Sequence, residues 1–473
     1  MKETWFIEPF VDKGLGNSAY LIGSHDTKKG VLIDPLRDVD RYLHAASERG
    51  LRVTHVLDTH LHADFVSGNR EIAHQTGAVI GASAEAKLGF DHQPLTEQSV
   101  IDLGAFQIRV MTTPGHTPEH ISFLIVEPDS KTPAALFSGG ALIVGGAART
   151  DLLTPELTKP LARSLYHTIH DKLLKLPDQL EVFPTHGAGS YCVAPTSSER
   201  TTTIGRERIS NSLALAPSEE EFIQRALAGL PSYPTYYKYL REVNQRGPRI
   251  LGGVPVLKPL SAGEVKEMID NGAVILDVRH GKAFGAGHIP NSYGIRADAP
   301  LTTWAGWLIP FGSRTVLVAE STEQTLAATR QLIRIGYDDL VGRLEGGIEA
   351  WARGYPVETI ESIDVNELRE RLDVGSDGRA ERTLLLIDVR QKSEWDEGHI
   401  PGAVHFEGGR AAWEQLPFPH DRPLAIQCSS GNRSMSVSSV LRRRGYRNVI
   451  QVEGGIKRWE KNGFDITREN STS

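Results

Sequence analysis

An internal repeat in the second half of the chain constrains the fold most. Residues 274–292 (VILDVRHGKAFGAGHIPNS) match residues 385–403 (LLIDVRQKSEWDEGHIPGA), and residues 334–357 match residues 443–466. The period of about 110 residues is far longer than the unit of a solenoid, so the repeat predicts two copies of one domain. In each copy short apolar runs alternate with helical patterns, which predicts a small α/β fold with a parallel sheet.

A chain of 473 residues is too long for one hydrophobic core. We expect three domains: residues 1–250, which include a helical extension after residue 195, then residues 256–360 for the first copy and 361–473 for the second. In the first 195 residues strand-like runs alternate with helical ones, and residues 67–77 predict a helix. Strand-like runs lie at 51–59, 105–113, 120–126, 133–139 and 180–185. Loops with His, Gly, Asp or Arg follow these runs, which predicts a site assembled from strand ends.

Composition narrows the class of protein. A net charge of −7 argues against a general nucleic-acid binder, and no apolar run reaches the roughly 20 residues of a membrane span. The first residues lack the apolar stretch of a signal peptide. Two cysteines, Cys192 and Cys428, exclude a disulfide framework. These features predict a cytoplasmic protein without nucleic-acid or membrane partners. The oligomeric state, including a homo-oligomer, stays open.

The second copy contains the sequence LAIQCSSGNRSMSV (424–437). An apolar strand delivers Cys428 into a loop of small residues, and a helix is expected to begin near Arg433 or Ser434. Backbone N–H groups of such a loop and of the helix N-terminus favour an anion, which makes Cys428 a candidate nucleophile as a thiolate. Arg433 adds positive charge, and the predicted substrate-binding residues of the loop are Ser429, Ser430, Gly431, Asn432 and Ser434. A buried structural cysteine and phosphatase chemistry are the alternatives.

The second copy resembles the rhodanese family of sulfurtransferases. The resemblance rests on Asp388-Val389-Arg390, Gly398-His399-Ile400-Pro401, the Cys428 loop and Glu453-Gly454-Gly455. It implies sulfane-sulfur transfer through a persulfide on Cys428, with Arg433 as a further catalytic residue, thiosulfate or a thiol persulfide as substrate, and no cofactor. The first copy has Glu320 near the position of the cysteine, so it resembles an inactive rhodanese domain.

The first 195 residues resemble the metallo-β-lactamase superfamily, most closely its persulfide dioxygenase and glyoxalase II branches. Four blocks carry the resemblance: THLHADF (59–65), residues 112–125, residues 137–153 and FPTHGAG (183–189). It implies an αββα sandwich. The implied first-metal ligands are His60, His62 and His116, and Asp64 and His186 belong to the second metal. Phe65 and Gly140 stand where the family has a histidine and an aspartate.

With those two ligands missing, we expect one divalent ion on His60, His62 and His116. Iron follows from the resemblance and zinc from the three-histidine set, and a metal-free domain is the alternative. Arg149 either meets an anionic substrate or pairs with Asp151.

For the whole chain, the resemblance implies sulfane-sulfur transfer coupled to a domain that binds or oxidises low-molecular-weight thiol persulfides, as in bacterial sulfide-detoxification fusions. The alternatives are a metal-dependent thioester hydrolase of the glyoxalase II type and a metal-free persulfide-binding module that feeds the rhodanese.

Overall fold

The structure is a computed structural model that describes residues 4–128, 130, 132–193, 198–298, 300–373 and 384–468. The chain divides into two compact units, Met1–Val254 with Ile333–Gly336, and Pro255–Leu332 with Tyr337–Ser473. The finer domain boundaries at residues 250, 256 and 360 stay a prediction, and their outer ends, residues 1–3 and 469–473, lie outside the described residues.

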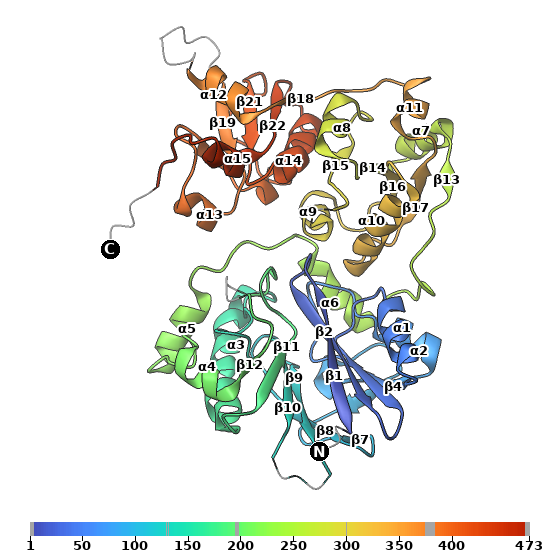
Figure 1. The fold of residues 1–473 in the computed structure, drawn as a ribbon, viewed down its shortest axis with the longest axis vertical. Coiled ribbons are helices and arrows are strands. Elements are labelled where there is room, and N and C mark those ends of the chain that lie inside the picture. Colours follow the sequence, from blue (N-terminus) through green and yellow to red (C-terminus); the bar gives the residue numbers. More distant parts are fainter. Residues whose placement is uncertain are drawn as a thin grey trace. The chain divides into compact units, whose positions relative to one another are not determined.

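The first unit is a sandwich of two six-stranded sheets (Figure 1). One sheet has the order β1-β2-β3-β4-β5-β6 and the other β12-β11-β10-β9-β8-β7. Their inner faces form one core, in which Tyr20 and Ile33 of the first sheet join Phe123 and Phe137 of the second. Separate apolar clusters attach helices α1 and α2 to the outside of the first sheet and α3, α4 and α5 to the outside of the second. The expected αββα sandwich is confirmed.

The five strand-like runs predicted in the first unit correspond to β4, β8, β9, β10 and β11, and the predicted helix corresponds to α2. The strands are β1 (Trp5–Asp12), β2 (Asn17–Ser24), β3 (Lys29–Ile33), β4 (Arg52–Leu57), β5 (Val79–Ser83), β6 (Gln93–Leu95), β7 (Val100–Asp102), β8 (Gln107–Thr112), β9 (Ile121–Val126), β10 (Ala135–Gly139), β11 (Glu181–Pro184) and β12 (Thr202–Thr203). The helices are α1 (Asp40–Glu48), α2 (Asn69–Thr76), α3 (Pro155–His167), α4 (Ile204–Ser210), α5 (Glu219–Leu227) and α6 (Tyr237–Arg246).

Helix α2 begins two residues later than the pattern predicts. The Ser67 hydroxyl donates to the Asp58 carboxylate, 2.9 Å away, and accepts the Asn69 backbone N–H at 3.2 Å. Ser67 therefore ties the entry of the helix to the end of strand β4. The helix ends as predicted at Gly77, whose φ of +71° suits glycine.

The second unit contains two five-stranded parallel sheets of identical topology, β13-β17-β16-β14-β15 and β18-β22-β21-β19-β20. The two predicted copies and their parallel sheets are confirmed. No helix of the described residues is both long and apolar enough to cross a bilayer.

The elements of the first copy are β13 (Pro259–Leu260), α7 (Ala262–Asp270), β14 (Val274–Asp277), α8 (Gly281–Ala286), β15 (Tyr293–Gly294), α9 (Leu301–Leu308), β16 (Thr315–Val318), α10 (Thr322–Arg334), β17 (Leu340–Leu344) and α11 (Gly347–Ala352). Those of the second are β18 (Glu361–Ile363), α12 (Val365–Asp373), β19 (Leu385–Asp388), α13 (Lys392–Glu397), β20 (Val404–His405), β21 (Leu424–Gln427), α14 (Asn432–Arg443), β22 (Val449–Val452) and α15 (Gly455–Lys461).

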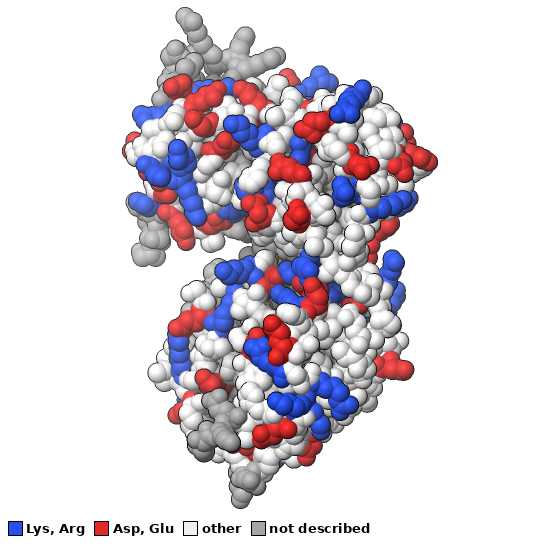
Figure 2. Space-filling model, turned by 45° about the vertical axis from the view of Figure 1, so that its right-hand side comes forward, with Lys and Arg blue, Asp and Glu red and all other residues white. Residues whose placement is uncertain are grey.

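Charges of both signs are mixed on the molecular face shown in Figure 2. Lysine and arginine side chains alternate with aspartate and glutamate side chains there. The mixture matches the modest net charge of −7 on 473 residues.

Candidate functional site

Strand β21 ends directly before Cys428, and helix α14 begins four residues later at Asn432. The backbone N–H of Gly431 donates to the Cys428 sulfur at a distance of 3.1 Å. Gly431 has a φ of +96°, a backbone conformation that a side chain would strain. The sulfur therefore lies in a loop with an amide directed at it, at the N-terminal end of a helix, as an anion site requires.

The turn after strand β22 packs against the Cys428 loop and forms two backbone hydrogen bonds with it. The Cys428 carbonyl accepts the Ile456 N–H at 2.8 Å, and the Ser429 carbonyl accepts the Lys457 N–H at 3.1 Å. A Cβ added to Gly455 would lie 2.0 Å from the Cys428 carbonyl oxygen, so only glycine allows this approach. Cys428 itself has 0% exposed surface.

Arg433 makes a bidentate ion pair with Glu394 of helix α13, with nitrogen–oxygen distances of 2.5 and 2.7 Å. Burial would raise the pKa of Glu394, but the Arg433 guanidinium outweighs it and lowers this pKa. The pair anchors the first turn of helix α14 to helix α13. The Arg433 guanidinium is thus paired with a carboxylate that the sequence analysis did not include.

The other predicted loop residues have different surroundings. Ser434 is buried, and its hydroxyl donates to the Gly431 carbonyl at 2.8 Å, so it stabilises the loop. Ser430 is exposed at the loop tip and Ser429 is half-buried. The Asn432 side chain accepts a hydrogen bond from Arg296 of the first copy, which also pairs with Asp298. Arg296 was missed by sequence reasoning, because no local pattern shows which residue of one copy reaches the loop of the other.

In the first unit, three buried histidines present ring nitrogens to one point: His60, His116 and His186. They follow strands β4, β8 and β11. The Nε2 atoms of His60 and His186 are 3.3 Å apart, which is about the separation of two imidazole nitrogens bound to one tetrahedral zinc ion. The predicted set had His62 in place of His186. His62 lies in a second group of possible ligands, with Asp64 and His186, and the ligand set stays a prediction.

The second ring nitrogen of each histidine in this group has a fixed partner. Nδ1 of His60 lies 2.9 Å from the Thr59 hydroxyl, Nδ1 of His116 donates to the Arg149 carbonyl at 2.6 Å, and Nδ1 of His186 lies 3.0 Å from the Asn17 side-chain oxygen. Such outer contacts set the tautomer that leaves Nε2 with its lone pair. Burial lowers the pKa of both His116 and His186 to about 3. The rings are neutral at pH 7, as metal ligands must be.

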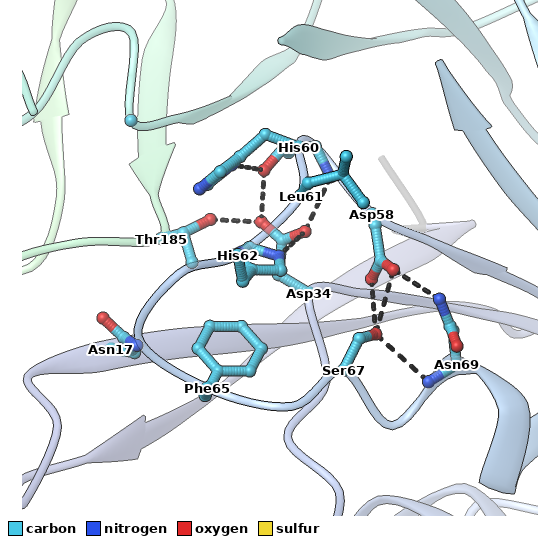
Figure 3. A network of polar contacts seen from close by, with 12 residues as sticks. Asn17, Asp34, Asp58, His60, Leu61, His62, Phe65, Ser67, Asn69 and Thr185 are labelled. Carbon is cyan, nitrogen blue, oxygen red and sulfur yellow. Dashed lines mark hydrogen bonds and ion pairs between the residues drawn. The ribbon is translucent and has the colours of Figure 1, made fainter. Parts of the chain in front are cut away.

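His62 is held by Asp34 instead (Figure 3). Its Nε2 lies 3.1 Å from the Asp34 carboxylate, and its ring stacks on Phe65 at 4.0 Å between centroids. Burial alone would lower the pKa of His62, but the Asp34 carboxylate overrides it and raises this pKa. Asp34, which has a positive φ of 49°, also accepts hydrogen bonds from Thr59 and Thr185. It was missed, although an aspartate directly after buried strand β3 is a signal that can be read from sequence.

His62, Asp64 and His186 form a second group of buried residues that could hold a metal ion. Asp64 accepts from the Asn17 amide at 2.7 Å and lies 3.5 Å from Nδ1 of His186. Phe65, which stands where the resemblance implies a histidine, is fully buried and stacks on the His62 ring. At Gly140, a Cβ would lie 2.6 Å from the His116 ring, so no carboxylate fits there while His116 keeps its position.

Helix α6 supports the loop after strand β4, which contains His60 and His62. Arg241 pairs bidentately with buried Glu119 at 2.9 Å, and Glu119 also accepts the Leu61 N–H at 3.0 Å. The Asn244 amide donates to the carbonyls of His62 and Phe65, at 2.8 and 2.9 Å. The helical extension is therefore part of the support of the site, a role that its sequence did not suggest.

Replacing Arg241 by glutamine should lower the free energy of unfolding by about 3 kcal/mol, because a buried carboxylate loses its partner. The matched control is Arg246→Gln on the same helix, whose exposed pair with Glu242 is worth less than about 1 kcal/mol. The measurement is calorimetry of the full chain.

Burial would raise the pKa of Glu119, but Arg241 lowers it. The stabilisation is therefore present above about pH 4.5 and is lost as the pH falls through the lowered value. Equal melting temperatures for the two variants would contradict this.

Arg149 and Cys192 are both buried in the first unit. The Arg149 guanidinium pairs with Asp151 at 2.6 and 2.7 Å and donates to the carbonyls of Tyr191 and Pro231. Of the two roles considered for Arg149, the structure shows the ion pair with Asp151. The other hydrogen bonds of the guanidinium go to backbone carbonyls inside the protein. Burial foremost, and then the Asp64 charge, raise the pKa of Cys192 well above its ordinary value, so this thiol packs as an unreactive side chain.

Comparison with known proteins identifies the parts of the chain. A family model described as rhodanese-like domain matches residues 261–353 and 364–462, and one described as metallo-beta-lactamase superfamily matches residues 12–186. The human protein named persulfide dioxygenase ETHE1, mitochondrial, is 30% identical over 188 residues, which is 38% of this chain and 68% of that protein. The chain belongs to the metallo-β-lactamase superfamily, with persulfide dioxygenase homology, and is fused to two rhodanese-like domains.

Two further relatives show how far the similarity of this fusion extends. A mouse hydroxyacylglutathione hydrolase-like protein is 32% identical over 170 residues, covering 36% of this chain and 57% of that protein. A crystal structure titled metallo-beta-lactamase from Staphylococcus aureus is 30% identical, with a TM-score of 0.65, and covers 72% of this fusion and 99% of that chain. Both rhodanese-like copies of the fusion match the same family model, although only the second has a cysteine in the loop after its central strand.

Proposed function

We propose that the fusion transfers sulfane sulfur through a persulfide on Cys428. The observation that carries the proposal is the Gly431 N–H directed at the Cys428 sulfur, 3.1 Å away, at the start of helix α14. A persulfide keeps the negative charge of the thiolate and moves it by one sulfur atom. The same loop amides and helix end therefore stabilise both states of the cysteine.

The proposed reaction needs no external oxidant or reductant. The Cys428 thiolate attacks the outer sulfur of thiosulfate, a new sulfur–sulfur bond forms, and sulfite leaves with the electron pair of the broken bond. An acceptor thiolate, or cyanide in an assay, then attacks the terminal sulfur of the persulfide, and the Cys428 thiolate is released. With a thiol persulfide as donor, the leaving group is the thiolate of the carrier.

For the first domain we propose one divalent ion on His60, His116 and His186, and a low-molecular-weight thiol persulfide as ligand. The support is the shared position of three neutral, buried imidazoles and the persulfide dioxygenase homology. A bound ion supplies a Lewis acid with open coordination positions. Gly140 leaves the domain without the carboxylate ligand of its family, so binding of the persulfide is proposed ahead of its oxidation. The cytoplasmic location stays a prediction.

Oxygen uptake and metal content test the role of this domain. The purified full chain is loaded with iron or zinc and supplied with glutathione persulfide, or with a glutathione thioester in parallel. We expect about one ion per chain, no thioester cleavage, and oxygen uptake that does not exceed the uncatalysed rate. Rapid oxygen consumption by the iron form would replace binding by oxidation, and thioester cleavage by the zinc form would replace it by hydrolysis.

Arg296 should support sulfur transfer from outside the second copy, because it holds the Asn432 side chain beside the loop. Arg296→Gln should raise the KM for thiosulfate roughly tenfold, through loss of one charge-assisted hydrogen bond and one positive charge near an anionic substrate. Steady-state thiosulfate:cyanide kinetics measure it. The control is Arg314→Gln, an exposed arginine of the same copy that pairs with Asp339. An unchanged KM in Arg296→Gln would remove Arg296 from the account.

A further inference from the structure

The first rhodanese-like copy has a cavity where the second copy has its cysteine loop. The two sheets have the same order, so the loop after strand β16 corresponds to the Cys428 loop after strand β21. The cavity has a volume of about 420 Å³ and lies between that loop, residues 319–322, and the turn at residues 343–349. A volume of this size is in the range of about 300–1,000 Å³ typical of small-molecule sites.

The charges that line this cavity are of both signs. Arg279 is neutralised within the protein, because it pairs with buried Asp277 at 2.6 Å and donates to the Gly287 carbonyl at 2.7 Å. Three charged side chains of the lining remain: Glu320, Arg343 and Glu349. Within the described part of the chain, none of these three side chains has a hydrogen bond or an ion pair to another side chain. Glu320 and Glu349 act on the Arg279 guanidinium only through space. The three side chains are open to a ligand, with two negative charges and one positive charge.

The charged side chains open to a ligand in this cavity have a net negative charge, which disfavours an anionic ligand. Ala319 follows strand β16 as Cys428 follows strand β21, so the position of the sulfur nucleophile holds no reactive group. Glu320 comes next in the loop and Glu349 adds a second carboxylate, so a dianion such as thiosulfate would be repelled. A ligand that matches the lining has an ammonium group for the carboxylates and a carboxylate for the Arg343 guanidinium. The apolar lining residues Ala283, Leu344 and Ile348 suit a short aliphatic part between them.

We propose that the first rhodanese-like copy is a binding site for a zwitterionic, amino-acid-type molecule, whose ammonium group contacts Glu320 and Glu349 and whose carboxylate contacts Arg343. In this proposal the first copy binds a charged small molecule and does not transfer sulfur. The inference stands on the charges and the volume of this cavity alone, and it does not depend on the sulfur transfer proposed for Cys428.

Calorimetric titration of the full chain tests the site. The probe is S-methyl-L-cysteinylglycine, a neutral zwitterion whose blocked sulfur cannot react at Cys428. We expect binding of one molecule per chain, at least tenfold weaker binding of the N-acetylated probe, which lacks the ammonium group, and at least tenfold weaker binding of the probe to Glu320→Gln and to Arg343→Gln. Glu320 is exposed, so its substitution leaves the fold intact.

The matched control is Glu267→Gln, an exposed glutamate on helix α7 that does not line the cavity. It should bind the probe as the unmodified chain does. No heat of binding at millimolar probe, equal affinity for the N-acetylated probe, or unchanged affinity in Glu320→Gln would each overturn the proposal. Sulfur transfer at Cys428 should be the same in Glu320→Gln and in the unmodified chain, so failure here is distinguishable from failure of the proposed transferase function.

Discussion

Cys428→Ser should lower thiosulfate:cyanide sulfur transfer by roughly 10³-fold or more, to the level of the uncatalysed reaction. The serine hydroxyl is not ionised at neutral pH and forms no stable bond to sulfane sulfur, so the covalent step is lost. The substitution changes one atom in a loop whose amide contacts stay in place, and the melting temperature should remain within a few degrees. Thiocyanate formation measured over a range of thiosulfate concentrations gives the result.

The matched control is Cys192→Ser in the first unit. Cys192 is the second of the two cysteines in the chain, and it is buried with a raised pKa. Its substitution should leave sulfur transfer unchanged. Substantial activity in Cys428→Ser, or a comparable loss in Cys192→Ser, would refute Cys428 as the sulfur carrier.

The second large effect concerns the metal. His116→Ala and His186→Ala should each weaken binding of a divalent ion by more than the roughly 10–100-fold that loss of an outer contact costs. Each variant removes one of three ring nitrogens that converge on a single point. Metal content of the full chain after dialysis, measured by elemental analysis, should fall from about one ion to a small fraction.

His62 provides the contrast, because the sequence placed it in the ligand set and the structure pairs it with Asp34. His62→Ala should lower the free energy of unfolding by about 3 kcal/mol, since the buried Asp34 carboxylate loses its ion-pair partner and keeps only the hydrogen bonds from Thr59 and Thr185. Metal content of the folded fraction should stay near that of the unmodified chain. If His62→Ala loses the ion and His186→Ala keeps it, the set predicted from sequence is right and the set in the structure is wrong.

Much of this molecule can be read from its sequence because the signals are local. The repeat around Asp277 and Asp388 identifies the two parallel domains, and the run from Leu424 to Arg433 already contains strand, loop and helix start in order. Cys428 is found for the same reason, since its anion site is built from consecutive residues. Each of these features depends on neighbours in the chain.

The features that could not be predicted depend on contacts between residues far apart in the sequence. The surroundings of His62 are an example, because its Nε2 contacts Asp34, which lies 28 residues before it in the chain. Arg296 reaches Asn432 across 136 residues, and helix α6 supports the histidine loop through Glu119. A single sequence contains no periodicity or motif that records such pairs. They follow from how the sheets and helices pack.

Intact-peptide mass spectrometry after incubation with thiosulfate, without added acceptor or reductant, tests the central claim most directly. The account predicts that the peptide containing Cys428 gains the mass of one sulfur atom, that cyanide removes it with release of thiocyanate, and that no other peptide gains it. A Cys428 peptide of unchanged mass, in a preparation that still transfers sulfur from thiosulfate to cyanide, would contradict the account.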